Sequence, residues 1–128
     1  MEIKIKTTKH DEILDITDKI AELIKNEETE EGMCFVFVKH TTCAVTTSEY
    51  TNDVKQDFLD FLRKITPQIN FRHDQKHSPD HLLSSLIGPS LSIPIKDGAL
   101  DLGTWQRVFL VELSGPKERT ISVTIIDE

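Results

Sequence analysis

Apolar and polar residues alternate along several short segments of the chain, which is the pattern of strands with one buried face. Residues 2–7 and 12–17 show this pattern first, and we expect these two strands to pair with each other. Residues 33–39 are apolar on both faces, which predicts a central strand. Further strands are predicted at 90–96, 105–113 and 119–126.

Helical spacing of apolar residues predicts three helices between these strands. The first runs from Thr17, the expected N-cap, to about residue 26, and the second from 51 to about 64. The third has Ser78 as its expected N-cap and Gly88 just beyond its end. Strands and helices do not alternate regularly, so the fold class is α+β. We expect a largely antiparallel mixed sheet core with about three helices packed against it.

Composition limits the chain to one domain and excludes some classes of partner. With 38% hydrophobic residues among 128 and no change of composition, the chain is expected to form a single domain, residues 1–128. A net charge of −7 excludes an extended nucleic-acid interface. No apolar run approaches the roughly 20 residues that cross a membrane, and the two cysteines lack zinc or redox spacing. These features predict a cytoplasmic protein without a membrane partner.

The segment KHTTCAVTTSE combines a histidine, a row of hydroxyls and an acid. One interpretation is an edge strand whose threonines favour β structure and whose His40 lies at its end. The other is that His40, Thr41 and Thr42 line a cleft, with His40 as a metal ligand or acid–base group and Glu49 as a carboxylate. Both interpretations stay open at this point.

The segment FRHDQKHSPDH carries His73, His77 and His81 at intervals of four residues. On one continuous helix these imidazoles would lie near one face, but Pro79 indicates that the helix begins only there. What remains is a His-Asp pair in a loop and a histidine in the first turn of a helix, where free N–H groups favour anions. These histidines either face solvent or contribute to a metal or phosphate site.

The segment DGALDLGTWQ leads into an apolar strand and ends in the only tryptophan of the chain. Trp105 is either a core residue or the wall of a pocket. Strand alternation places Trp105 and Arg107 on one face and Gln106 on the other. Unless the backbone bends there, Trp105 and Gln106 therefore cannot both point into the same pocket.

Five motifs in order along the chain resemble one protein family. They are HTTCAVTTSE, FRHD, SPDHLLSSLIGPS, IPIKDGALDLGTWQ and VELSGPKERTISV. Together they are similar to the YjbQ-type family, formerly uncharacterised and now usually called the secondary thiamine-phosphate synthase family. The resemblance covers nearly the whole chain. It implies a compact α+β subunit that assembles as a homotrimer with clefts near the subunit boundaries.

The resemblance implies a transferase that joins a pyrimidine diphosphate to a thiazole phosphate and releases pyrophosphate. The expected partner is thus a small phosphorylated metabolite. The residues assigned to catalysis are His40, His73, Gln106 and Glu49. Those assigned to substrate binding are Thr41, Thr42, Trp105, Gln106, Arg107 and Arg119, the two arginines as phosphate-binding cations. A divalent metal, Zn or Mg, is expected on His40, His73 and His81.

Two other functions remain open. If the three imidazoles hold zinc and activate a water molecule, the protein is a metal-dependent hydrolase or lyase of unknown substrate. Alternatively, it is a non-catalytic trimeric protein that binds a phosphorylated metabolite or a metal. In that case any weak synthase activity would follow from holding two phosphorylated ligands close together.

Overall fold

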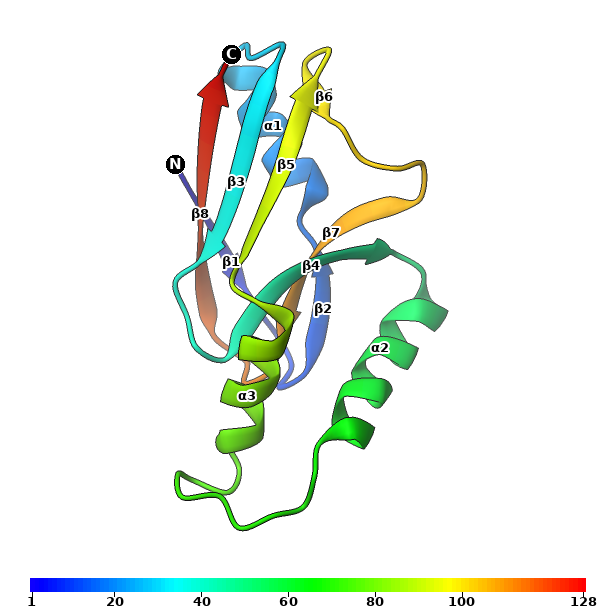
Figure 1. The fold of residues 1–128 in the computed structure, drawn as a ribbon, viewed down its shortest axis with the longest axis vertical. Helices are drawn as coiled ribbons and strands as arrows, with labels where there is room; N and C mark the ends of the chain where they lie inside the picture. The colour runs from blue at the N-terminus through cyan, green and yellow to red at the C-terminus, as the bar shows by residue number, and fades with distance from the viewer.

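Two antiparallel sheets form the centre of the fold, as the computed structural model of residues 1–128 shows (Figure 1). Sheet A has the order β1-β8-β3-β5-β6, formed by Glu2–Lys6, Glu118–Asp127, Gly32–Val38, Ser90–Lys96 and Ala99–Leu100. Sheet B has the order β2-β7-β4, formed by Glu12–Asp15, Gln106–Glu112 and Cys43–Glu49. The α+β class and the antiparallel pairing are as predicted.

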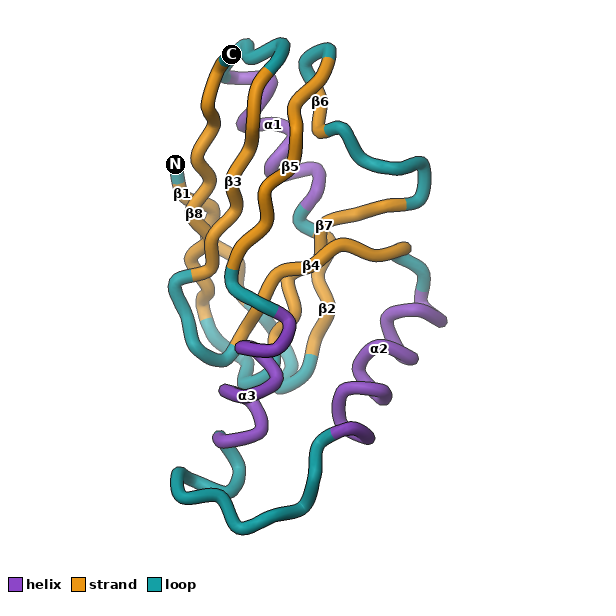
Figure 2. Tube along the Cα trace, in the orientation of Figure 1, coloured by secondary structure: helices purple, strands orange, loops and turns teal.

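Three helices flank these sheets (Figure 2). They are α1 (Thr17–Asn26), α2 (Asn52–Ile65) and α3 (Ser78–Ile87). Helix α1 packs against sheet A through Ile20 and Ile24, while α2 and α3 lie beside the opposite face of sheet B. None of the three is long and apolar enough to span a membrane.

Strand β7 carries core residues on both of its faces. Val108 and Leu110 belong to the large core between the two sheets and α1, whereas Phe109 and Val111 belong to a smaller core under α2 and α3. All four are fully buried. Sheet B is therefore a middle layer between the two cores, and the polar residues of the chain gather at its two ends.

The predicted pairing of residues 2–7 with 12–17 is wrong. Strand β1 pairs with β8 in sheet A, while β2 pairs with β7 in sheet B, opposite residues Phe109 to Glu112. Alternation fixes which face of a strand is buried but not which strand lies next to it, because several strands of the chain present a similar apolar face. The short connection after β1 thus moves the chain from one sheet to the other.

The first and third helices begin one residue away from their predicted caps. Thr17 is the first residue of α1, and its hydroxyl accepts a hydrogen bond from the Val108 N–H at 2.7 Å instead of capping the helix. Ser78 is likewise the first residue of α3, after His77. Thr51, in contrast, caps α2 by accepting from the Val54 N–H at 3.2 Å.

Strand β3 is central in sheet A, as predicted, but only one of its faces is buried. Cys34, Val36 and Val38 face the core, whereas Phe35 and Phe37 are 41% and 45% exposed. The neighbouring residue Ile126 of β8 is 53% exposed. The outer face of sheet A is therefore an uncovered apolar surface, which a soluble monomer rarely presents.

Candidate functional site

The residues assigned to a site fall into two groups at opposite ends of β4. The His40 group lies before β4 and comprises His40, Thr41, Thr42, His73, His81 and Arg119. The Trp105 group lies at the far end and comprises Glu49, Trp105, Gln106 and Arg107. Six strand steps from Cys43 to Glu49 separate the two ends by about 20 Å. One chain thus does not bring the two groups together.

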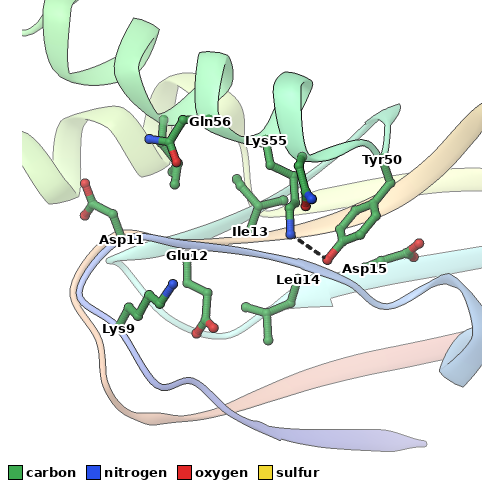
Figure 3. Close-up of a pocket in the computed structure, with 11 residues that line it drawn as sticks. Lys9, Asp11, Glu12, Ile13, Leu14, Asp15, Tyr50, Lys55 and Gln56 are labelled. Carbon is green, nitrogen blue, oxygen red and sulfur yellow. Dashed lines mark hydrogen bonds between the residues drawn. The ribbon is translucent and has the colours of Figure 1, made fainter.

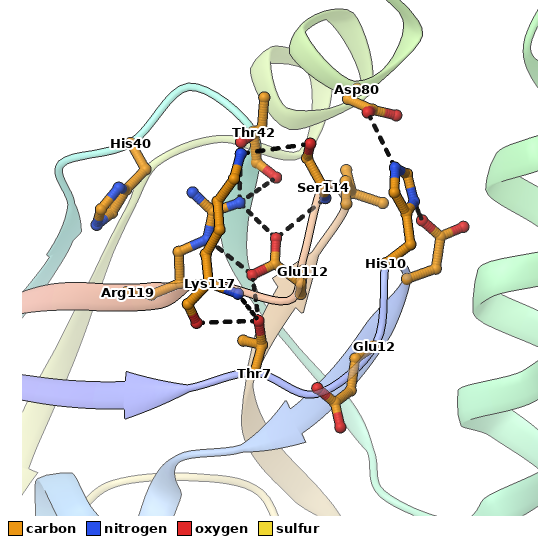
Figure 4. A network of polar contacts seen from close by, with 12 residues as sticks. Thr7, His10, Glu12, His40, Thr42, Asp80, Glu112, Ser114, Lys117 and Arg119 are labelled. Atoms are coloured by element: carbon orange, nitrogen blue, oxygen red, sulfur yellow. Dashed lines mark hydrogen bonds and ion pairs between the residues drawn. The ribbon is translucent and has the colours of Figure 1, made fainter. Parts of the chain in front are cut away.

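A buried ion pair supports the His40 group (Figure 4). The Arg119 Nε donates to Glu112 Oε2 at 2.7 Å, and its Nη2 contacts the other carboxylate oxygen and donates to Thr42 Oγ1 at 2.9 Å. Glu112 also accepts from the Thr7 hydroxyl at 2.8 Å and from the Ser114 N–H at 3.0 Å. Burial raises the pKa of Glu112, but these hydrogen bonds outweigh it and hold the pKa below its ordinary value.

The charge of Arg119 is therefore already neutralised by a partner within the protein. Arg119 is 2% exposed, and Glu112 is completely buried. Through Thr42 it holds the segment that leads from His40 into β4. These contacts give Arg119 a positioning role, and its expected contact with a phosphate stays a prediction.

His40 is held as a neutral ring. The Thr120 N–H donates to His40 Nε2 at 2.9 Å. Burial, followed by the nearby Arg119 and Lys117, lowers the pKa of His40 despite the opposing charge of Glu112. Because the Nε2 lone pair is occupied, Nδ1 carries the hydrogen of the neutral ring and can only donate. His40 in this state is a hydrogen-bond donor and not a general base.

A small pocket of about 160 Å³ lies beside His40, lined by His40, Thr41, Cys43, Ser84, Ser85 and Pro89. The Ser84 hydroxyl is buried and has no hydrogen-bond partner, which is uncommon for a buried polar atom. Burial raises the pKa of the Cys43 thiol to about 11, so the thiol is un-ionised at neutral pH. The pocket therefore presents uncharged polar groups of which at least one, Ser84, lacks a partner.

Sequence reasoning did not select Ser84. The available signal was its place in α3 beside the core residue Leu83, where a polar side chain needs a partner. Serine is tolerated on many helix faces, however, and only the packing against the His40 segment shows that its hydroxyl is enclosed.

The three histidines assigned to a metal do not form a metal centre within the chain. His73 and His81 lie together, with ring centroids 5.3 Å apart. His81 Nδ1 lies 3.2 Å from the Thr41 carbonyl oxygen and must donate to it, since a carbonyl only accepts. No three His, Cys, Asp or Glu side chains are arranged to hold a metal ion. One chain alone thus forms no such centre, and the expected zinc or magnesium stays a prediction.

A second polar network sets the position of α3. Arg63 of α2 donates to Asp11 Oδ2 at 2.7 Å and to Asp80 Oδ1 at 2.9 Å. Asp80 is fully buried, and its Oδ2, which has no hydrogen-bond partner, lies 3.5 Å from His10 Nε2. The network joins both helices to the connection before β2 and fixes the residue next to His81.

In the Trp105 group, Trp105 lies in the turn before β7, where the Gln106 N–H donates to the Gly103 carbonyl oxygen at 3.0 Å, so strand alternation begins at Gln106, one residue later than predicted. The Gln106 amide donates to Thr47 Oγ1 at 2.9 Å and its oxygen accepts from the Gly103 N–H at 3.0 Å. Gln106 thus ties β7 to β4. Trp105 is 73% exposed and lines a pocket of about 380 Å³ with Asp15, Glu49, Tyr50, Thr51, Thr104 and Arg107.

Arg107 is paired with two carboxylates. Its Nε donates to Asp15 Oδ2 at 2.6 Å and its Nη2 to Asp18 Oδ1 at 3.0 Å. Burial raises the pKa of Asp15, but hydrogen bonds from Thr17 and Arg107 outweigh it and lower the pKa overall. These ion pairs count against Arg107 as a phosphate-binding cation.

A larger groove of about 510 Å³ lies between β2 and α2 (Figure 3). It shares two lining residues, Asp15 and Tyr50, with the Trp105 pocket. Its charged lining includes both signs, and Lys55 Nζ donates to the Tyr50 hydroxyl at 3.2 Å across it. None of the residues assigned to the site lines this groove.

These features define a class of protein: a two-sheet α+β fold with a polar pocket near each end of sheet B. The chain matches the family described as UPF0047 protein YjbQ-like over residues 1–128. It belongs to that family. It is 40% identical to the UPF0047 protein MJ1081 of Methanocaldococcus jannaschii, over 98% of this chain and 92% of the relative. A UPF0047 protein of Archaeoglobus fulgidus is 36% identical, over 96% and 98% of the two chains.

Solved structures confirm the fold. A crystal structure of a YjbQ/UPF0047 family protein from Clostridium acetobutylicum has a TM-score of 0.93 and 36% identity, covering 98% of this chain and 99% of that one. A YbjQ-like protein of unknown function from Sulfolobus solfataricus has a TM-score of 0.94 and 32% identity, covering 100% and 96%. Both the fold and the family are thus shown, and no relative named here carries a stated activity.

Proposed function

We propose that this protein is a thiamine-phosphate synthase-like transferase, with the His40 pocket as its phosphate subsite. The observation that carries the proposal is the buried Ser84 hydroxyl without a partner beside the neutral donor His40. Buried polar groups without partners are expected where a ligand completes them. At about 160 Å³ the pocket is smaller than the roughly 300 Å³ of whole-ligand sites, so it suits one phosphoryl group of a larger molecule.

The proposed reaction needs little covalent assistance from the protein. The thiazole nitrogen attacks the methylene carbon of the pyrimidine diphosphate, the carbon–oxygen bond breaks, and pyrophosphate leaves with the electron pair. The products are thiamine phosphate and pyrophosphate. Donors fixed near the leaving oxygens stabilise the charge that develops there, and His40 and Ser84 would supply such donors. No step is assigned to a metal, because the histidines do not form a centre for one.

We further propose that the protein acts as a homotrimer with its sites between subunits. The His40 and Trp105 groups lie about 20 Å apart in one chain, so they can form one cleft only if they come from neighbouring chains. The exposed apolar residues Phe35, Phe37 and Ile126 supply a surface that assembly would cover. A small phosphorylated metabolite remains the proposed ligand.

A non-catalytic binder is the second candidate, and one observation favours it. His40 has its Nε2 lone pair engaged by Thr120, so this group offers no evident general base. Such a protein would hold phosphorylated ligands without turning them over. A metal-dependent hydrolase or lyase has no such observation in its favour, since no three metal-ligating side chains converge within one chain.

The test is synthase activity of the purified protein with the pyrimidine diphosphate and the thiazole phosphate, measured as thiamine phosphate formed per active chain. We expect multiple turnovers that decrease at least about tenfold in Ser84→Ala, the order of effect of removing one transition-state donor. Ser85→Ala removes the other serine hydroxyl of the same pocket, from an exposed residue that is not enclosed as Ser84 is, and should retain more activity. Binding of pyrophosphate without turnover would instead support the binder, and neither binding nor turnover would refute both.

A further inference from the structure

The pocket around Trp105 carries chemistry different from that of the His40 pocket. Trp105 is 73% exposed although the strand that follows it is the most buried of the fold. An exposed indole leaves a large, flat apolar surface at the wall of the pocket, on which a planar ligand can stack. At about 380 Å³ the pocket is within the size range of small-molecule sites.

Negative charge is in excess around this pocket. The Arg107 guanidinium is shared between Asp15 at 2.6 Å and Asp18 at 3.0 Å. Glu49 lines the same pocket and has no basic partner among the ion pairs of the chain. The pocket lining thus carries two carboxylates, Asp15 and Glu49, against one guanidinium, and Asp18 outside the lining takes a further share of the Arg107 charge. A phosphate placed here would be repelled, whereas a cation would be attracted.

The aromatic wall adds to this preference. The face of an indole ring attracts cations more strongly than that of tyrosine or phenylalanine. Tyr50 already has Lys55 Nζ 4.6 Å from its ring centroid, so one aromatic ring of the pocket is occupied by a cation of the protein. Trp105 is the aromatic surface that remains open, and Glu49 is the carboxylate available beside it.

We propose that the Trp105 pocket binds a small organic monocation whose charge is spread over a heteroaromatic ring, the thiazolium class. The indole stacks on the ring and Glu49 faces its charge. The choice of thiazolium rests on the proposed function, in which the thiazole ring becomes cationic as its nitrogen is alkylated. The preference for a cation over a neutral ring or a phosphate rests on the pocket alone.

The fluorescence of Trp105 tests the pocket directly, because the chain contains no other tryptophan. The probes are 4-methyl-5-(2-hydroxyethyl)thiazole, its N-methylated thiazolium and its phosphate ester, which share one ring and differ in charge. We expect saturable quenching by the thiazolium, with binding about tenfold tighter than that of the neutral thiazole. The phosphate ester should bind no better than the neutral ring.

Variants separate charge from shape. Glu49→Gln keeps the size of the side chain and should weaken thiazolium binding about three- to tenfold while leaving the neutral ring unchanged. Trp105→Phe, followed by calorimetry, should weaken the thiazolium more than the neutral ring. Equal binding of the neutral and cationic rings, or preferred binding of the phosphate, would overturn the proposal. So would Trp105 emission that neither the thiazolium nor a neutral quencher changes, which would place the indole in a subunit contact.

These outcomes are independent of catalysis. Selective thiazolium binding in a protein without synthase turnover would support the cation pocket and refute the transferase. Synthase turnover without selectivity for the cation would do the reverse.

Discussion

Arg119 and Arg107 lie near opposite ends of β7 and are each held by carboxylates, yet they differ in what surrounds them. Arg119 is 2% exposed and pairs with the fully buried Glu112. Arg107 has a side chain that is 37% exposed and shares its charge with Asp15 and Asp18 at the rim of a pocket. The first pair is enclosed by the protein, and the second is open to solvent and ligand.

The difference shows that residue type alone does not identify a phosphate-binding arginine. Both arginines have the right chemistry, and both lie beside residues of a conspicuous motif. In the folded chain Arg119 stabilises the segment that carries His40, while Arg107 leaves an excess of negative charge beside Trp105. The groups that lack partners, Ser84 and Glu49, are better indicators of where a ligand binds.

Glu112→Gln is expected to have the largest effect on stability, about 3–5 kcal/mol, because it leaves the Arg119 charge buried without its counter-ion. Urea unfolding followed by circular dichroism measures the loss. The double variant Glu112→Gln with Arg119→Met removes both charges and should recover much of it. A cost under about 1 kcal/mol for the single variant would show that the pair is not enclosed.

Arg107→Gln should destabilise the protein by about 1 kcal/mol or less, since its ion pairs are partly exposed and screened by water. Repeating the urea titration at high salt should shrink the difference further. The same salt series should change the effect of Glu112→Gln much less. If the two arginine sites responded alike to salt, the contrast between enclosed and open pairs would fail.

Ser84→Ala should leave the free energy of unfolding unchanged or raise it by up to about 1 kcal/mol, because the hydroxyl that is removed makes no hydrogen bond in the folded chain. Thermal unfolding measures this. The same substitution should weaken pyrophosphate binding in a calorimetric titration. A clearly lower stability would mean that the hydroxyl has a structural partner and is not reserved for a ligand.

The smallest effect concerns pH. The pKa of His40 is lowered in the folded state from its ordinary value of about 6.5, so below that value the folded chain binds fewer protons than the unfolded chain. Stability from this group is complete above about pH 6.5 and decreases as pH falls through the lowered pKa. His40→Gln does not titrate, so its urea midpoint should depend less on pH between about 5 and 7.5. An unchanged pH dependence would contradict the assignment of His40.

Local patterns predicted much of the fold. The apolar alternation of residues 90–96 and 119–126 and the helical stripe after Thr51 specify their elements, because each element buries one face whatever its neighbours are. The pairing of β2 with β7 could not be read in this way. Nor could the exposure of Phe35 and Phe37, since an apolar residue does not reveal whether its partner is the same chain or another.

The site was predictable only in part. The strand was predicted to begin at Trp105, but β7 begins at Gln106 and Trp105 lies in the preceding turn, so alternation does not decide which of the two lines a pocket. In the folded chain it is Trp105 that lines the pocket. The motifs did not show that Glu112 forms an ion pair with Arg119, because the carboxylate and the guanidinium come from two different sheets. Contacts between sheets depend on how the sheets pack, and Ser84 is missed for a similar reason, because only the packing of α3 beside the His40 segment encloses its hydroxyl.

The length of β4 also sets the distance between the two pockets of one chain. A bivalent ligand that joins a thiazolium to a phosphate would reach both pockets of one chain only with a linker of about 20 Å. Avidity is highest when the linker matches the distance between sites. A series of linkers would therefore report the spacing directly, and an optimum much shorter than 20 Å would measure the gap between two neighbouring chains.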